Sequence, residues 1–225
     1  MRAIASASID HGWRVPAVKW LMVESAFTGG VAIYGFYALQ PYLLELYGDP
    51  HAYVIAGLSA AIVAASQIVG GVAAPRVRRL FRDRASALIA LAAASALTIA
   101  MLGVVESFWG VIALASVWGL LFAATSPIRQ AFLNDMIPSR QRATILSFDS
   151  LMDSVGGVWG QPVLGRAADA WGYAPSYAMA AGHLGARAAV PRPVAPPGRP
   201  GRRQGVPRGR GKAGHRMTNT TRRRR

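Results

Sequence analysis

Two carboxylates mark the stretch of the chain whose residues could do chemistry. Asp149 and Asp153 stand four residues apart in a mostly small and apolar segment, a spacing that puts them on one face of a helix. Asp153 lies about 15 Å along that helix, near the middle of a bilayer. A carboxylate in hydrocarbon costs roughly 3 kcal/mol or more, so it usually faces a watery cavity or a partner. We interpret the pair as a site that couples a proton or cation, or that contacts a cationic substrate.

Each candidate also has a plainer interpretation. Asp149 is close enough to the start of its segment to be hydrated, or to be stabilised by the dipole at the helix N-terminus. Glu24 is a candidate for substrate contact, and an ion pair with the nearby Lys19 or a place at the membrane interface is the alternative. Gln67 and Gln161 either line the cavity or hydrogen-bond between helices.

A basic residue, Arg129, follows Pro127 closely. This position is more typical of the cytoplasmic end of a helix than of a binding site, and pairing with Asp149 is the alternative. The sequence contains no phosphate-cradling loop, nucleophile triad or metal-ligand spacing, and Cys is absent. It therefore predicts a protein that is not an enzyme and that holds no cofactor and no metal.

The elements that must position these residues are membrane helices. Of the 225 residues, 52% are hydrophobic, and they are grouped in runs of about twenty, the length that crosses roughly 30 Å of hydrocarbon. We therefore expect an all-α, polytopic membrane helix bundle, in which Pro41 and Pro75 end the first two helices. The expected spans are 17–39, 52–74, 85–105, 108–125 (or onward to 133) and 143–164. A sixth apolar segment, from about 175, is too short to span.

The charge is divided unevenly along the chain. Thirteen of the 25 Lys and Arg residues, and no Asp or Glu, fall in 183–225, which explains most of the net charge of +15. We expect a cytoplasmic segment over 1–15, a transmembrane half-bundle over 16–182 and a disordered basic tail over 183–225. The tail either binds anionic lipid or nucleic acid without sequence specificity or is a frameshift product that replaces the rest of the sixth helix.

Loop charges predict the orientation. Segments 1–19, 76–84 and 128–142 contain eleven Lys and Arg residues, whereas 41–51, 104–107 and 166–175 contain one. Because basic loops stay in the cytoplasm, we expect the N-terminus and the arginine-rich loops to face the cytoplasm, with the protein in the inner membrane.

A short pattern recurs in two of the expected helices. Residues 67–74 and 161–168 both fit Q-x-x-x-G-x-A-A, each in the second helix of a three-helix group. Inverted three-plus-three repeats of this kind are typical of secondary transporters.

Several motifs together resemble the major facilitator superfamily of secondary transporters. The stretch Gly71-x-x-x-Pro75-Arg76-x-Arg78-Arg79 is similar to its cytoplasmic loop motif, with Pro75 in place of the usual Asp and Arg78 in place of a usual Gly. The run from Asn134 to Ser147 resembles the loop before the family's eleventh helix, and Gly165-x-x-x-Asp169-x-x-Gly172 resembles the exit from that helix. The residues of this chain that match the family's motifs at the entry to and exit from that helix are Arg142, Gly165, Asp169 and Gly172.

The resemblance covers about 16–182 and implies the C-terminal six-helix half of a twelve-helix transporter of a small solute. It also implies that the loop arginines at 76, 78 and 79 act as a gating latch to a neighbouring helix. On this interpretation the partners are the lipid bilayer, the solute, and a missing N-terminal half or a second copy, with no specific nucleic acid. The alternative is a half-size membrane protein that dimerises, or that acts as a scaffold with a basic lipid- or nucleic-acid-binding tail.

Overall fold

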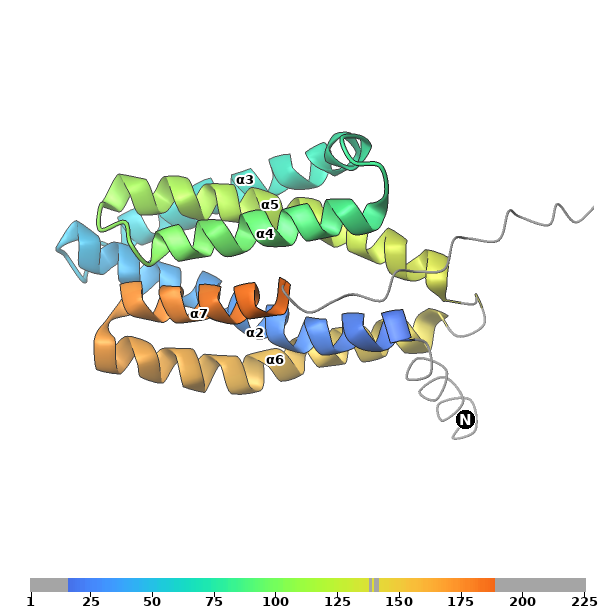
Figure 1. Ribbon diagram of the computed structural model, residues 1–225. Helices are drawn as coiled ribbons and strands as arrows, with labels where there is room; N and C mark the ends of the chain where they lie inside the picture. Colours follow the sequence, from blue (N-terminus) through green and yellow to red (C-terminus); the bar gives the residue numbers. More distant parts are fainter. Residues whose placement is uncertain (1–15, 138, 140–141, 189–225) are drawn as a thin grey trace, which may run out of the picture. The chain divides into compact units, whose positions relative to one another are not determined.

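The apolar runs form long helices in the computed structural model, which describes residues 16–137, 139 and 142–188. These residues fall in one unit of the chain, 1–194, and the second unit, 195–225, lies outside the described part. The basic tail was expected to begin at 183, but 183–188 are helical; the rest of the tail lies outside the described residues and stays a prediction. The helices are α2 (Pro16–Tyr47), α3 (Tyr53–Arg79), α4 (Arg84–Leu102), α5 (Phe108–Met136), α6 (Arg142–Trp171) and α7 (Tyr173–Ala188) (Figure 1).

The predicted all-helical membrane bundle is confirmed, but three predicted helix ends are wrong. α6 continues past the expected end at 164 to Trp171, and two helices continue through the prolines that were expected to end them. α2 continues through Pro41 to Tyr47, and α3 continues through Pro75 to Arg79. Membrane helices tolerate proline because neighbouring groups satisfy the backbone carbonyls that it frees. The continuation of the fourth helix past Pro127 is correct, since α5 ends at Met136.

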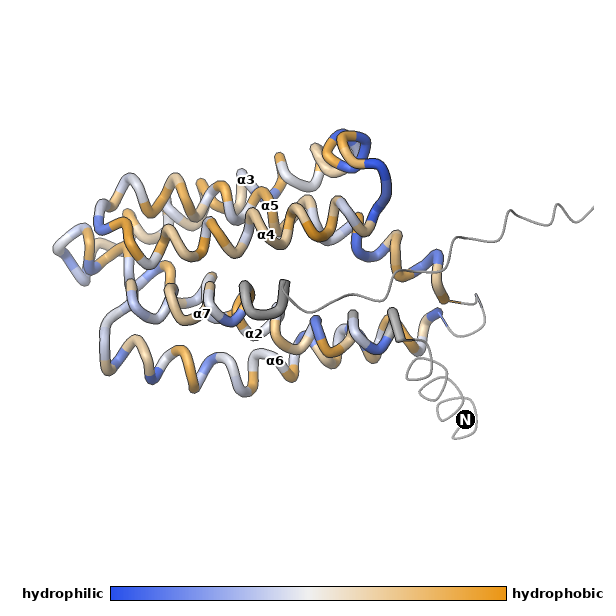
Figure 2. Tube along the Cα trace, viewed as in Figure 1, coloured by the Kyte–Doolittle hydropathy of each residue, from blue (hydrophilic) through white to orange (hydrophobic). Residues whose placement is uncertain are grey.

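Three of the described helices, α3, α4 and α5, are long and apolar enough to cross a membrane by length and composition. Figure 2 shows hydrophobic residues along these helices and hydrophilic residues at the α3–α4 connection. Large apolar side chains on α3 point outward, with Val54 83% exposed and Ile68 70% exposed. An outward apolar surface of this kind suits contact with lipid tails. α6 is longer than any of the three spans, but it carries Asp149 and Asp153 within its length.

Helix pairing follows the internal repeat. α2 packs on α6, α3 packs on α5, and α4 packs on both α5 and α7. The repeat makes α2 equivalent to α5, α3 to α6 and α4 to α7. Under this equivalence the α2–α6 contact corresponds to the α5–α3 contact, and the α4–α7 contact corresponds to itself. Inverted three-helix repeats produce this arrangement, in agreement with the pattern repeated at 67–74 and 161–168.

Glycines set the distance between paired helices. A Cβ atom on Gly156 of α6 would lie 2.0 Å from the Ala26 carbonyl oxygen of α2, and one on Gly30 would lie 2.4 Å from the Gly156 carbonyl oxygen. α3 and α5 approach as closely, because a Cβ on Gly70 would lie 2.2 Å from the Leu120 carbonyl oxygen. Close backbone approach at small residues is how membrane helices gain packing contacts.

The α3–α4 loop is fixed by polar contacts outside the apolar spans. Asp83 caps α4 by accepting hydrogen bonds from the Ser86 backbone N–H (2.7 Å) and the Ser86 hydroxyl (2.9 Å). These bonds, with a smaller contribution from the charge of Arg78, hold the pKa of the Asp83 carboxyl below its usual value. Arg84 forms an ion pair with Asp135, which joins the start of α4 to the end of α5.

Candidate functional site

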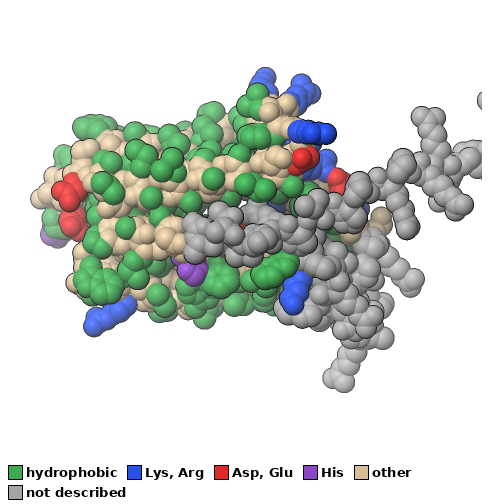
Figure 3. Space-filling view, viewed as in Figure 1, with side chains coloured by type: hydrophobic (Ala, Val, Ile, Leu, Met, Phe, Trp, Pro, Cys, Tyr) green, Lys and Arg blue, Asp and Glu red, His purple; other side chains and the backbone are tan. Residues whose placement is uncertain are grey.

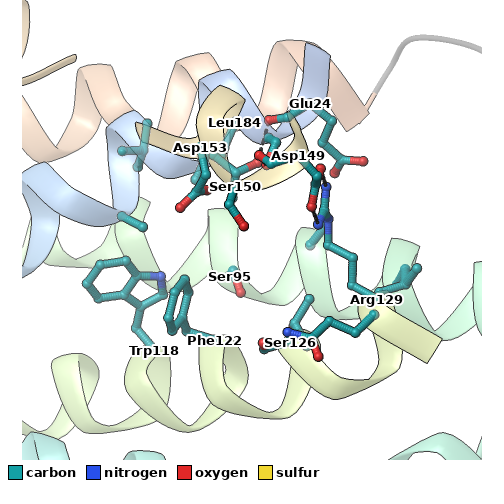
Figure 4. Close-up of a pocket in the computed structure, with 18 of the residues that line it drawn as sticks. Glu24, Ser95, Trp118, Phe122, Ser126, Arg129, Asp149, Ser150, Asp153 and Leu184 are labelled. Carbon is teal, nitrogen blue, oxygen red and sulfur yellow. Dashed lines mark hydrogen bonds and ion pairs between the residues drawn. The ribbon is translucent and has the colours of Figure 1, made fainter. Parts of the chain in front are cut away.

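A cavity of about 540 Å³ lies between α2, α4, α5 and α6, with Leu184 of α7 at its edge (Figure 4). This volume is within the range of small-molecule sites. Apolar walls and a few polar groups line it, as is typical of such sites. The charged residues in its lining are Glu24, Arg129, Asp149 and Asp153.

Arg129 and Asp149 form a bidentate ion pair at this cavity. The two guanidinium Nη atoms of Arg129 lie 2.5 and 2.6 Å from the two carboxylate oxygens of Asp149, and the side chains are 21% and 11% exposed. The pairing that the sequence left open is therefore confirmed. Arg129 does not mark the end of its helix, because α5 continues to Met136. Each charge compensates the other at a depth where neither alone would be tolerated at low cost.

Asp153 lies one turn beyond Asp149 and also lines the cavity. Its backbone is pressed against α2, where a Cβ on Gly29 would lie 2.4 Å from the Asp153 carbonyl oxygen and 2.5 Å from Oδ1. The lack of a side chain at Gly29 thus makes room for Asp153. Within the described residues Asp153 makes no salt bridge. Figure 4 shows its carboxylate and the Ser150 side chain pointing into the open space, with Trp118 on the facing wall.

The structure brings Glu24 to the same cavity and leaves the two glutamines outside its lining. Glu24 lies on α2 beside the Arg129–Asp149 pair (Figure 4). Gln67 faces α5, since its Cγ is 3.3 Å from where a Gly119 Cβ would be. Gln161 is partly buried on α6. The position of Gln67 fits the interpretation that it packs between helices.

The loop-motif residues lie at the end of α3, away from the cavity. Arg76 and Arg79 are exposed, and Gly71 has open space around its α-carbon. Arg78 donates a hydrogen bond to the Phe81 carbonyl oxygen (2.9 Å), which ties it to its own loop. Figure 3 shows Lys and Arg side chains gathered at this end of α3. Their role as a latch to another helix stays a prediction.

The predicted motif residues of α6 lie toward the two ends of this helix. Near its start, Arg142 donates a hydrogen bond to the Asn134 carbonyl oxygen of α5 (3.2 Å). At its end, Gly172 adopts φ +89° between α6 and α7, a conformation that glycine adopts readily. Asp169 is exposed in the last turn, and Gly165 has open space around its α-carbon.

Sequence reasoning missed an aromatic wall on α5. Trp118 and Phe122 line the cavity, and the Trp118 ring stacks on Phe36 with centroids 4.4 Å apart. The available signal was position: Trp118 lies in the middle of a long apolar helix, whereas tryptophans of membrane proteins concentrate at the interfaces. Ser95 and Ser150 were missed as well, because only the tertiary arrangement of the bundle brings these residues of α4 and α6 to one cavity.

A comparison with protein families places these features in context. The family model described as Major Facilitator Superfamily matches residues 6–161, a range that includes α2 to α5 and the α6 residues of the cavity. No curated protein and no solved structure was found to match the chain. The family consists of transporters rather than enzymes, and its match agrees with the apolar helices, the repeated triplets and the charged cavity. The chain belongs to the major facilitator superfamily of membrane transporters.

Proposed function

We propose that the chain performs secondary transport of a small solute across the inner membrane and that the cavity is its binding site. The observation that carries this proposal is the placement of Arg129, Asp149 and Asp153 around one cavity inside a bundle of apolar helices. Ionisable groups at such depth are expensive, and they mark substrate and ion pathways in membrane proteins. Asp153 is the proposed coupling residue, which holds a proton or cation in one state and releases it in the other.

The proposal includes a second six-helix bundle. Transporters of this family bind the solute between two bundles that rock against each other, and the described helices form one bundle. The second bundle is either an N-terminal half or another copy of this chain.

The first prediction concerns this second bundle. Reconstituted as a monomer, the chain gives no saturable uptake of any member of a panel of small solutes, because one bundle alone cannot alternate access. The oligomeric state is measured on the same preparation by mass photometry. Saturable uptake by a monomeric preparation would contradict the two-bundle proposal, whereas uptake by a dimeric preparation would identify the second copy as the partner.

A second prediction concerns orientation. Asp49 and Arg82 are exposed in loops at opposite ends of α3, and the chain contains no Cys. Single cysteines in Asp49→Cys and Arg82→Cys are therefore expected to label differently in intact cells. An impermeant thiol reagent labels the first and labels the second only after permeabilisation, because arginine-rich loops stay in the cytoplasm. The reverse pattern would overturn the proposed orientation.

A further inference from the structure

We infer that the cavity binds a small organic cation with an apolar or aromatic body, such as a quaternary or protonated amine. This inference rests on the proposed transport site and adds the chemical class of its solute. Two walls of the cavity carry it: the acidic face of α6 and the aromatic face of α5.

The charge in the lining favours a cation. The one basic side chain among the described lining residues, Arg129, is held bidentately by Asp149, so the pair is neutral as a unit. Asp153 faces the same space without a salt bridge in the described part of the chain. Attraction between opposite charges is several times stronger in such a site than in water. A cationic solute therefore gains from Asp153, while an anionic solute meets a guanidinium that is already bound.

The aromatic wall consists of one buried ring, Trp118, and one accessible ring, Phe122. Trp118 is only 3% exposed and is stacked on Phe36. Gly35 makes room for it, since a Cβ there would lie 2.5 Å from Cη2 of the indole. Phe122 lies beside Trp118 with ring centroids 6.4 Å apart and is 37% exposed. Aromatic faces attract ammonium groups within about 6 Å of the ring centroid, and they also bury apolar surface.

The two walls face each other across the cavity. In Figure 4 the Asp153 carboxylate points into the space that Trp118 and Phe122 border from the other side. A cation with an apolar body satisfies both walls at once, with its charge between the carboxylate and the rings. All of these groups belong to the described bundle, so cation binding can be measured on the purified chain.

Equilibrium dialysis of the purified chain in lipid nanodiscs tests this inference with two probes of one shape. Phenyltrimethylammonium and benzenesulfonate share a phenyl body and a tetrahedral head, and they differ in the sign of the charge. The cation is expected to bind saturably, and the sulfonate is not. Asp153→Asn weakens cation binding at least tenfold. Phe122→Leu weakens it about threefold or more, as loss of one cation–π contact would.

The controls separate binding from folding. Asp169→Asn removes a carboxylate of the same helix at an exposed site outside the cavity lining and leaves cation binding unchanged. Phe122→Tyr keeps an aromatic face and is expected to retain cation binding. Phe122 is the residue changed because Trp118 is so deeply packed that its replacement would disturb the fold. Helix content of every variant is checked by circular dichroism.

Three results would overturn the inference: no saturable binding of the cation, equal binding of the sulfonate, or unchanged cation binding by Asp153→Asn. None of them by itself removes the proposed transport function, which is judged from solute uptake. If Asp153→Asn lost solute uptake but the wild type did not bind the cation, the proposed transport function would stand and the cationic class of its solute would be rejected. Unchanged uptake in Asp153→Asn would reject the transport role of this carboxylate whichever probe binds.

Discussion

Replacing Arg129 with Gln is expected to lower the free energy of unfolding of the purified chain more than replacing both Arg129 and Asp149 with amides. The single change leaves the Asp149 carboxylate, which is 11% exposed, without its guanidinium and one turn from Asp153. Breaking a buried pair costs about 3 kcal/mol or more. The double variant Arg129→Gln, Asp149→Asn leaves two amides that hydrogen-bond to each other, and it loses less.

Thermal unfolding followed by circular dichroism measures this difference. Arg84→Gln is the matched control, because Arg84 pairs with Asp135 in an ion pair whose side chains are 33% and 66% exposed. Exposed pairs contribute at most about 1 kcal/mol, so this variant unfolds near the wild-type temperature. If Arg129→Gln were no less stable than Arg84→Gln, the pair would not be buried as described.

Two alanine substitutions on α6 are expected to have opposite effects. Gly156→Ala destabilises the bundle, because the new Cβ would lie 2.0 Å from the Ala26 carbonyl oxygen of α2, a backbone atom that moves only with its helix. Overpacking of this kind costs about 1–3 kcal/mol. Gly165→Ala meets nothing within 4 Å and removes a glycine from a helix interior, a change that favours the helix by up to about 1 kcal/mol.

The comparison is made on unfolding temperatures in one detergent. Because both changes add the same methyl group to the same helix, helix propensity and detergent binding are matched. Equal shifts of the unfolding temperature would show that α2 and α6 do not meet at Gly156.

The apolar runs were sufficient to predict which parts of the chain are helical, because a membrane helix needs about twenty apolar residues. The helix ends were harder to place. Pro41 and Pro75 look like stops when each helix is considered alone, yet both lie inside helices whose neighbours stabilise them. Proline rules learned from soluble helices therefore shortened α2 and α3 in the prediction.

The candidate site was predictable only in part. Asp149 and Asp153 were found because a charge in an apolar run stands out. Trp118 and Phe122 were not found, because an aromatic residue in an apolar run is ordinary until tertiary packing aims it at a carboxylate. The partner of Arg129 depended on where the bundle places α5 relative to α6, which no local spacing specifies. Gln67 shows the converse, since a polar residue in an apolar run can simply pack between helices.

The most direct test of the central claim is solute uptake by membrane vesicles from the cells in which the chain is naturally made, so that its second bundle, whether an N-terminal half or another copy, is present. Uptake of a panel of small solutes is measured with and without a pH gradient for the wild type, Asp153→Asn and Asp169→Asn. We expect saturable uptake of at least one solute by the wild type and by Asp169→Asn, and at least a tenfold lower rate with Asp153→Asn, because its amide cannot take up and release a proton. Unchanged uptake and pH dependence with Asp153→Asn, or no saturable uptake of any solute by the wild type, would contradict the account.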